Sequence, residues 1–164
     1  MKNLKNNKKG FTLIELLAVI VILAILVAVA IPAVMRYLAT SREDTFRTNA
    51  SRAIETIRTD VTFSGINESV YYPLSEINGL LDKKLVTSPY GNKFGNDSYV
   101  KVTISGGTTT YSVCLTDGTY GISADENTLA TAEVSNTTKS CTTPTDAKEV
   151  TVSTTGGKTT IKNS

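Results

Sequence analysis

Residues 11–31, FTLIELLAVIVILAILVAVAI, form the most apolar stretch of the chain and dictate its architecture. Only Thr12 and Glu15 interrupt this stretch, and the sixteen residues from Leu16 to Ile31 carry no polar side chain. A helix over residues 11–31 would be roughly 31 Å long, about the thickness of the hydrocarbon core of a bilayer. A helix buried in a soluble domain usually keeps a polar face, whereas this one is apolar on every side. The stretch therefore predicts a helix that can span a membrane.

The charges of the chain are unevenly distributed. The 164 residues carry 17 Lys and Arg against 15 Asp and Glu, but Lys2, Lys5, Lys8 and Lys9 all lie in the first ten residues. The rest of the chain carries 13 basic against 15 acidic residues. A basic start predicts that the N-terminus stays cytoplasmic and that the chain beyond the span is exported. A secretory signal peptide has a similar outline, but its apolar region is typically about 7–15 residues and ends in a small-residue cleavage site. This apolar region is longer and continues through Pro32 into an amphipathic segment.

The composition excludes many enzyme classes. The chain has no His and only two Cys, which rules out His-based triads, His metal sites and four-thiolate zinc sites. Asp117, Asp125 and Glu126 could form a calcium site, but they lack the alternating ligands of an EF-hand loop and are interpreted as solvated turn residues. We therefore predict no catalytic residues, no cofactor, no metal and no nucleic-acid partner.

Glu15 is the exception within the apolar stretch. A carboxylate near the start of a membrane helix is disfavoured in hydrocarbon, and such a group usually has a function and a partner. The alternative is that Glu15 lies near the lipid headgroups and is simply solvated there. The residues alone leave both interpretations open.

The N-terminal residues resemble a known family. Lys8-Lys9-Gly10-Phe11-Thr12-Leu13-Ile14-Glu15 is similar to the N-terminal signature of type IV prepilins and the related pseudopilins, with the apolar helix and Pro32 downstream in the same register. The resemblance covers about the first 50 residues. It implies that a prepilin peptidase cleaves between Gly10 and Phe11 and methylates the new amine of Phe11. It also implies assembly of the mature subunits into a helical filament.

Three residues receive further roles. Cleavage would place a cationic amine on Phe11, one helical turn from Glu15, so the two charges could pair within a subunit or between neighbours. The resemblance favours pairing between subunits, as an incoming subunit joins the base of the filament. Pro32 predicts a bend near the end of the span, because its ring removes a helix hydrogen bond and clashes with the carbonyl of Ala28.

The rest of the chain predicts a helix packed on a sheet. Apolar residues recur at helical spacing beyond Pro32 and form what we call the apolar stripe: Phe46, Ala50, Ala53, Ile54, Ile57 and Val61. Alternating residues beyond position 98 predict strands, and packing their apolar faces on the stripe gives an α+β layer, the pilin fold that the resemblance implies. We expect a cleaved leader (1–10), a membrane-spanning and filament-core helix (11–32), the amphipathic half of the same helix (33–63), a connecting loop (64–97), and an antiparallel sheet with a C-terminal disulfide-bounded loop (98–164).

Turn residues divide the sheet region further. Gly106-Gly107 and Asp117-Gly118 predict hairpin turns, and Gly156-Gly157 predicts a third. The expected elements are a short helix at Leu74–Val86, strands at Tyr99–Ser105, Thr109–Thr116 and Thr119–Ile122, and a hairpin of Glu149–Thr154 with Thr159–Lys162.

Cys114 and Cys141 are expected to form a disulfide, because the exported side of the membrane is oxidising. The alternative is two unpaired thiols. Many pilins bound a surface loop with a C-terminal disulfide, and on that interpretation residues 115–140 are the exposed segment that contacts neighbours or surfaces.

The sequence therefore predicts the structural subunit of a type IV pilus. The precursor would be a single-pass protein of the cytoplasmic membrane, partnered by the lipid bilayer, the prepilin peptidase and the pilus assembly platform. The mature chain would be a homopolymer in an extracellular filament for adhesion, aggregation or twitching motility. Two alternatives remain: a pseudopilin or minor pilin of a type II secretion or DNA-uptake system, and a plain single-span protein with an exported binding domain.

Overall fold

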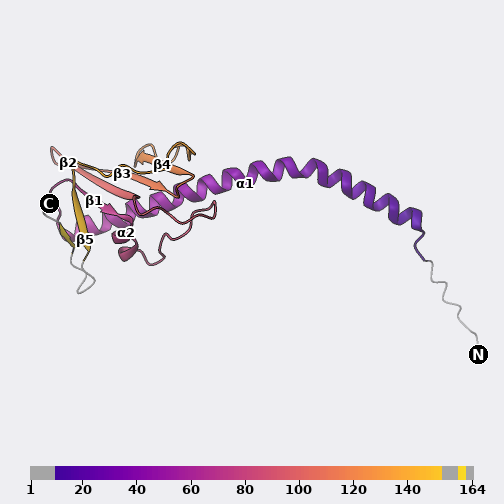
Figure 1. Cartoon of the computed structure of the whole chain (residues 1–164), viewed down its shortest axis with the longest axis horizontal. Helices are drawn as coiled ribbons and strands as arrows, with labels where there is room; N and C mark the ends of the chain where they lie inside the picture. Colours follow the sequence, from indigo (N-terminus) through magenta and orange to yellow (C-terminus); the bar gives the residue numbers. More distant parts are fainter. Residues whose placement is uncertain (1–9, 153–158, 162–164) are drawn as a thin grey trace, which may run out of the picture. The chain divides into compact units, whose positions relative to one another are not determined.

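A single long helix, α1, opens the structure. The computed structural model describes residues 10–152 and 159–161, and α1 spans Leu13–Ser64 (Figure 1). These bounds are close to the range 11–63 expected from the sequence. Gly65 ends the helix: its φ of 65° lies in the left-handed region that glycine adopts without strain, and its N–H donates to the carbonyl of Val61 at 3.1 Å. The helix continues through Pro32, and the predicted bend there stays a prediction.

The chain divides into two compact units, Met1–Thr40 and Ser41–Ser164. We call the second unit the head; it contains α1 from Ser41 onward and a six-stranded sheet in the order β4-β3-β2-β1-β5-β6. Neighbouring strands are antiparallel except β1 and β5, which run parallel. The elements after α1 are β1 (Val70–Pro73), α2 (Leu74–Leu80), β2 (Tyr99–Ser105), β3 (Thr108–Thr116), β4 (Gly121–Asp125), β5 (Lys148–Val152) and β6 (Thr159–Ile161).

The apolar stripe of α1 packs on this sheet and forms the core of the head. All six stripe residues are buried, with exposures between 0% and 7%, so the prediction of the buried face is confirmed. They belong to one apolar cluster with buried side chains of the strands, including Val70, Tyr72, Val100, Val102, Val113 and Leu115. The α+β class is therefore confirmed, with a helix as one layer and a mostly antiparallel sheet as the other.

Strand β1 was not predicted. It lies in the range 64–97 that was expected to be a connecting loop, yet it pairs with both β2 and β5 inside the sheet. Val70 and Tyr72 are fully buried, while Tyr71 and Pro73 are partly exposed on the other face. The strand is only four residues long and ends in proline, which is a weak strand signal in the sequence. Its pairing depends on residues far along the chain.

The hairpins differ from the prediction in detail. Gly106 and Gly107, with φ of 57° and 79°, form the predicted two-residue turn between β2 and β3, where both residues need positive φ. Strand β4 begins at Gly121, two residues later than predicted, because Asp117–Tyr120 form the turn before it. Helix α2 ends at Leu80, short of the predicted Val86. Strands β5 and β6 pair as a hairpin, whose predicted turn at Gly156-Gly157 lies outside the described residues.

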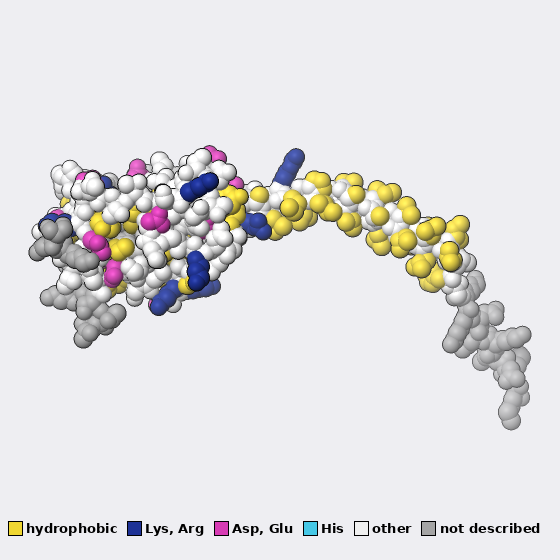
Figure 2. Space-filling model, viewed as in Figure 1, with side chains coloured by type: hydrophobic (Ala, Val, Ile, Leu, Met, Phe, Trp, Pro, Cys, Tyr) yellow, Lys and Arg dark blue, Asp and Glu magenta, His cyan; other side chains and the backbone are white. Residues whose placement is uncertain are grey.

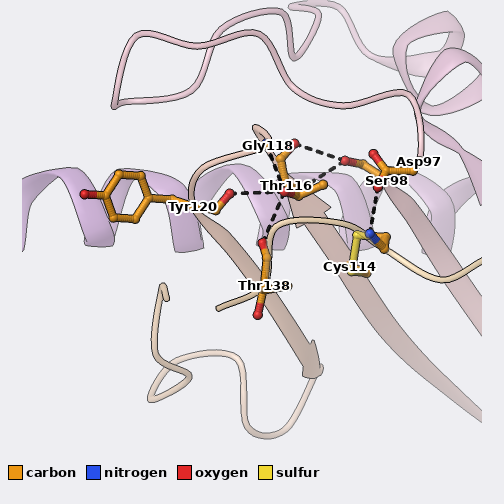
Figure 3. Close-up of a disulfide and its surroundings, with 8 residues drawn as sticks. Asp97, Ser98, Cys114, Thr116, Gly118, Tyr120 and Thr138 are labelled. Carbon is orange, nitrogen blue, oxygen red and sulfur yellow. Dashed lines mark hydrogen bonds between the residues drawn. A yellow bond between two sulfur atoms is a disulfide. The ribbon is translucent and has the colours of Figure 1, made fainter. Parts of the chain in front are cut away.

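Cys114 and Cys141 are joined by a disulfide that holds a C-terminal segment against the sheet (Figure 3). Gly121 and Ser135 exchange two backbone hydrogen bonds of 2.9 Å, and the N–H of Cys141 donates to the carboxylate of Asp97 at 2.7 Å. The expectation that residues 115–140 form an exposed segment holds for only part of that range. The range contains β4, and the part after β4 packs against the β4 edge of the sheet, where Leu129 and Val134 are buried in the apolar core.

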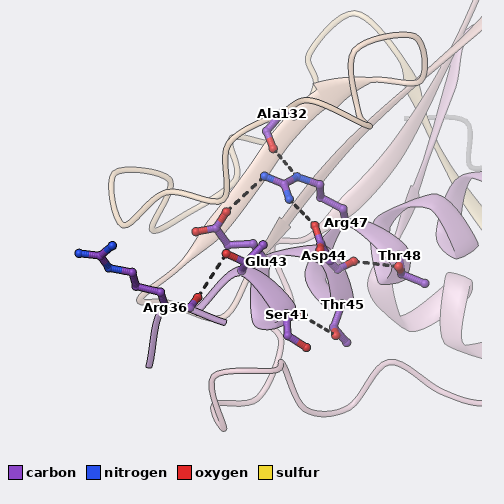
Figure 4. A network of polar contacts seen from close by, with 9 residues as sticks. Arg36, Ser41, Glu43, Asp44, Thr45, Arg47, Thr48 and Ala132 are labelled. Carbon is purple, nitrogen blue, oxygen red and sulfur yellow. Dashed lines mark hydrogen bonds and ion pairs between the residues drawn. The ribbon is translucent and has the colours of Figure 1, made fainter. Parts of the chain in front are cut away.

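Polar contacts also attach α1 to the rest of the head. Arg47 donates from Nε to the carbonyl of Ala132 at 2.7 Å and forms ion pairs with Asp44 and Glu43 (Figure 4). Further along α1, Arg58 pairs with Glu126, and its guanidinium lies 4.5 Å from the ring centroid of Tyr111. These contacts fix the side of α1 that faces the loop after β4.

Asp117 organises the turn between β3 and β4. Burial raises its pKa, but hydrogen bonds to its carboxylate from the hydroxyl of Ser88 and from the N–H groups of Tyr120 and Thr119 outweigh burial. The pKa therefore lies below its ordinary value. Asp117 and Glu126, two of the acids considered for a calcium site, are thus engaged by different partners in the head.

Candidate processing and assembly site

The residues of the candidate cleavage junction lie outside the helix. Gly10, Phe11 and Thr12 have no regular secondary structure, and α1 begins at Leu13. All three are exposed, and the side chain of Phe11 is 89% exposed. The Gly10–Phe11 bond therefore lies in exposed, non-helical backbone.

Thr12 caps the start of α1 and binds Glu15. The N–H of Thr12 donates to Oε2 of Glu15 at 2.8 Å, and the Thr12 hydroxyl donates to the same oxygen at 2.9 Å. In return the N–H of Glu15 donates to Oγ1 of Thr12 at 3.3 Å. This reciprocal arrangement is a capping box, which satisfies backbone donors that the first helical turn leaves unpaired. Glu15 therefore has a hydrogen-bond partner within its own chain.

The first unit presents an apolar surface. An 18-residue window of α1 has a mean hydropathy of 3.2 and no buried residue, and α1 is long and apolar enough to cross a membrane. Its exposed large side chains include Leu13, Ile20, Ile25 and Val29, and Figure 2 shows apolar side chains along this half of the helix. A surface of this size and composition needs lipid or protein around it, because exposed apolar area of this extent is unfavourable in water.

The structure brings together some of the predicted site residues and not others. Glu15 contacts Thr12. The predicted pair between Glu15 and a Phe11 amine would require cleavage, because the nitrogen of Phe11 is part of the peptide bond with Gly10. Pro32 lies within α1, and the two cysteines lie in the head. The contact of Thr12 with Glu15 was not predicted from the sequence. The spacing Thr-x-x-Glu immediately before an apolar run was the signal that could have identified it.

The comparisons with known proteins agree with the N-terminal geometry. Residues 5–31 match the family model described as the prokaryotic N-terminal methylation motif. No curated protein and no solved structure matches the chain. The matched range includes the Gly10–Phe11 junction, the capping box and the apolar helix, and it is consistent with a membrane-anchored precursor. The chain thus carries, at residues 5–31, the class III leader of type IV pilins.

Proposed function

We propose that this protein is the structural subunit of a type IV pilus. A prepilin peptidase cleaves between Gly10 and Phe11 and methylates the new amine of Phe11. The mature chain then polymerises through its N-terminal helix into a surface filament for adhesion, aggregation or motility.

One observation carries the proposal: the methylation motif at residues 5–31 includes the start of a helix whose apolar side chains are exposed on all sides. In the membrane this surface contacts lipid. Outside the membrane it needs another cover, and identical helices from neighbouring subunits provide one. Bundling α1 with its copies replaces lipid by protein, which supports a homopolymer rather than an isolated anchor.

Glu15 determines where each incoming subunit is placed along the filament. After cleavage, the Phe11 amine of an incoming subunit can pair with the Glu15 carboxylate of a subunit already in the filament. An unpaired charge in the dry centre of a filament is strongly unfavourable, so this pairing selects the correctly placed subunit.

The proposal is tested on sheared surface material from cells that express the chain. Electron microscopy is expected to show filaments, and mass spectrometry is expected to show that the chain in them begins with methylated Phe11. A chain that retains residues 1–10 in the cell would refute the proposal and favour the plain membrane anchor. A processed chain that is scarce in sheared material and forms no long filaments would instead identify a pseudopilin or minor pilin.

A substitution at Glu15 tests the assembly step separately. Glu15→Ala is expected to leave cleavage at Gly10–Phe11 intact and to abolish filaments, because the carboxylate that receives the amine is lost. Asp82→Ala, which removes an exposed carboxylate of the head, serves as the matched control and should assemble normally. Normal filaments from Glu15→Ala would refute the role of Glu15.

A further inference from the structure

We propose that Thr12 is a positioning residue for Glu15 during filament assembly. The proposal rests on the function proposed above and extends it to a residue that the motif comparison does not assign. Thr12 holds the Glu15 carboxylate before a neighbouring subunit is available. It leaves one carboxylate oxygen open to the Phe11 amine of the incoming subunit.

Thr12 binds only one of the two carboxylate oxygens of Glu15. Both donors of Thr12, its N–H and its hydroxyl, bind the same oxygen of Glu15, Oε2, at 2.8 and 2.9 Å. The hydrogen bonds of Glu15 within residues 10–152 and 159–161 do not involve the other oxygen, Oε1. The carboxylate is therefore held back over the first turn of α1, toward the end of the helix where Phe11 lies, with one oxygen occupied and one open.

Thr12 can also replace water as a hydrogen-bond donor to Glu15. Glu15 stands at the start of an apolar span, where hydrogen bonds from the chain replace those from water. In a precursor the Phe11 nitrogen is an amide, so no N-terminal cation is present to pair with the carboxylate. Thr12 is the partner available at that stage. It limits the cost of carrying a carboxylate into the membrane without consuming the oxygen that the later ion pair uses.

The side chain and the backbone of Thr12 can be separated by substitution. Thr12→Val keeps nearly the same shape and retains the backbone N–H bond to Oε2, but it removes both interactions of the hydroxyl. Thr12→Ser keeps all three hydrogen bonds and is the matched control. A role through the hydroxyl therefore predicts a defect in the valine variant and none in the serine variant.

The experiment measures how well each full-length variant enters filaments in competition with the wild type. Each variant is co-expressed with the wild type, and mass spectrometry gives the variant-to-wild-type ratio in sheared filaments relative to that ratio in the membrane. The same spectra report cleavage and methylation at Phe11. Thr12→Val is expected to be processed normally and to enter filaments about tenfold less well, the scale of one hydrogen bond to a charged group. Thr12→Ser should stay close to the wild type.

A double variant tests whether Thr12 acts through Glu15. Glu15→Gln removes the charge, and its residual incorporation into filaments formed by the co-expressed wild type serves as the reference. Adding Thr12→Val to it is expected to cause no further loss of incorporation. If the valine substitution lowers incorporation equally in the wild-type chain and in the Glu15→Gln variant, Thr12 merely caps the helix and the proposal is overturned.

Three other outcomes would also overturn the proposed role of Thr12. Equal incorporation of Thr12→Val and Thr12→Ser overturns the role of the hydroxyl, and blocked cleavage of Thr12→Val assigns Thr12 to processing instead. Both results leave the proposed function intact, because the wild type still forms filaments. Failure of the wild type itself to be cleaved or to assemble overturns the proposed function and this proposal with it.

Discussion

Removal of the Cys114–Cys141 disulfide is expected to destabilise the head by about 3.5 kcal/mol. The two cysteines are 27 residues apart. In the chain-entropy model, closing a loop of this size lowers the entropy of the unfolded chain by roughly 12 cal/mol/K, which corresponds to about 3.5 kcal/mol at 25 °C. Both cysteines are more than nine-tenths buried, so replacing them by alanine keeps the site apolar. The melting temperature is expected to fall by roughly 10–15 °C.

The measurement compares three samples of the full chain in detergent micelles: the oxidised wild type, the wild type treated with reductant, and the double variant Cys114→Ala/Cys141→Ala. Urea unfolding is followed by near-UV circular dichroism of the tyrosines, which report on the head. The two samples without the disulfide should agree with each other, and their m-values should exceed that of the oxidised protein, because an unfolded chain without the cross-link is more expanded. A loss of stability below about 1 kcal/mol, or an unchanged m-value, would refute the loop-closure reasoning.

Two glycines and one carboxylate give the remaining predictions. Gly121→Ala is expected to destabilise the head by about 1–3 kcal/mol in the same unfolding assay, because an added Cβ would overlap the carbonyl oxygens of Thr138 and Leu115. Its control, Gly79→Ala in α2, meets open space and should stabilise by roughly 0.5–1 kcal/mol; a loss at Gly79 as large as that at Gly121 would contradict the steric argument. Because the pKa of Asp117 is lower in the folded protein than its ordinary 3.8, ionised Asp117 stabilises the fold above about pH 4, and this stabilisation is lost as the pH falls through the folded pKa. Asp117→Asn should therefore be less stable than the wild type at pH 7, with a difference that shrinks below about pH 4; a difference independent of pH would contradict the assignment.

The helix could be predicted from the sequence because its signals are local. The apolar run, the helical spacing of the stripe and the glycine that follows Ser64 all lie within a few residues of the features that they determine. The capping box of Thr12 and Glu15 is equally local, because its Thr-x-x-Glu spacing stands directly at the start of the apolar run. The Gly106-Gly107 turn is also predictable from local sequence, since two adjacent glycines suffice for its backbone angles.

The sheet could be predicted only in part because strand pairing joins distant residues. Strand β1 becomes an interior strand through contacts with β2 and with β5, and the residues of β5 that pair with it lie 78 positions further along the chain. The four residues Val70–Pro73 contain no sequence signal that predicts pairing with β2 or β5. The segment before Cys141 is similar, because its packing against the β4 edge depends on Gly121, Asp97 and the disulfide together.

By itself the sequence determined the apolar helix, the methylation motif at residues 5–31, the buried stripe and the α+β class. These features depend on helical periodicity and on a short motif, both of which involve residues close together in the chain. Only the tertiary structure decided the strand order, the parallel pair of β1 and β5, and the packing of the segment between β4 and Cys141 against the sheet. The physical reason is that a strand or a covering segment gains its stability from hydrogen bonds and burial supplied by residues remote in the chain.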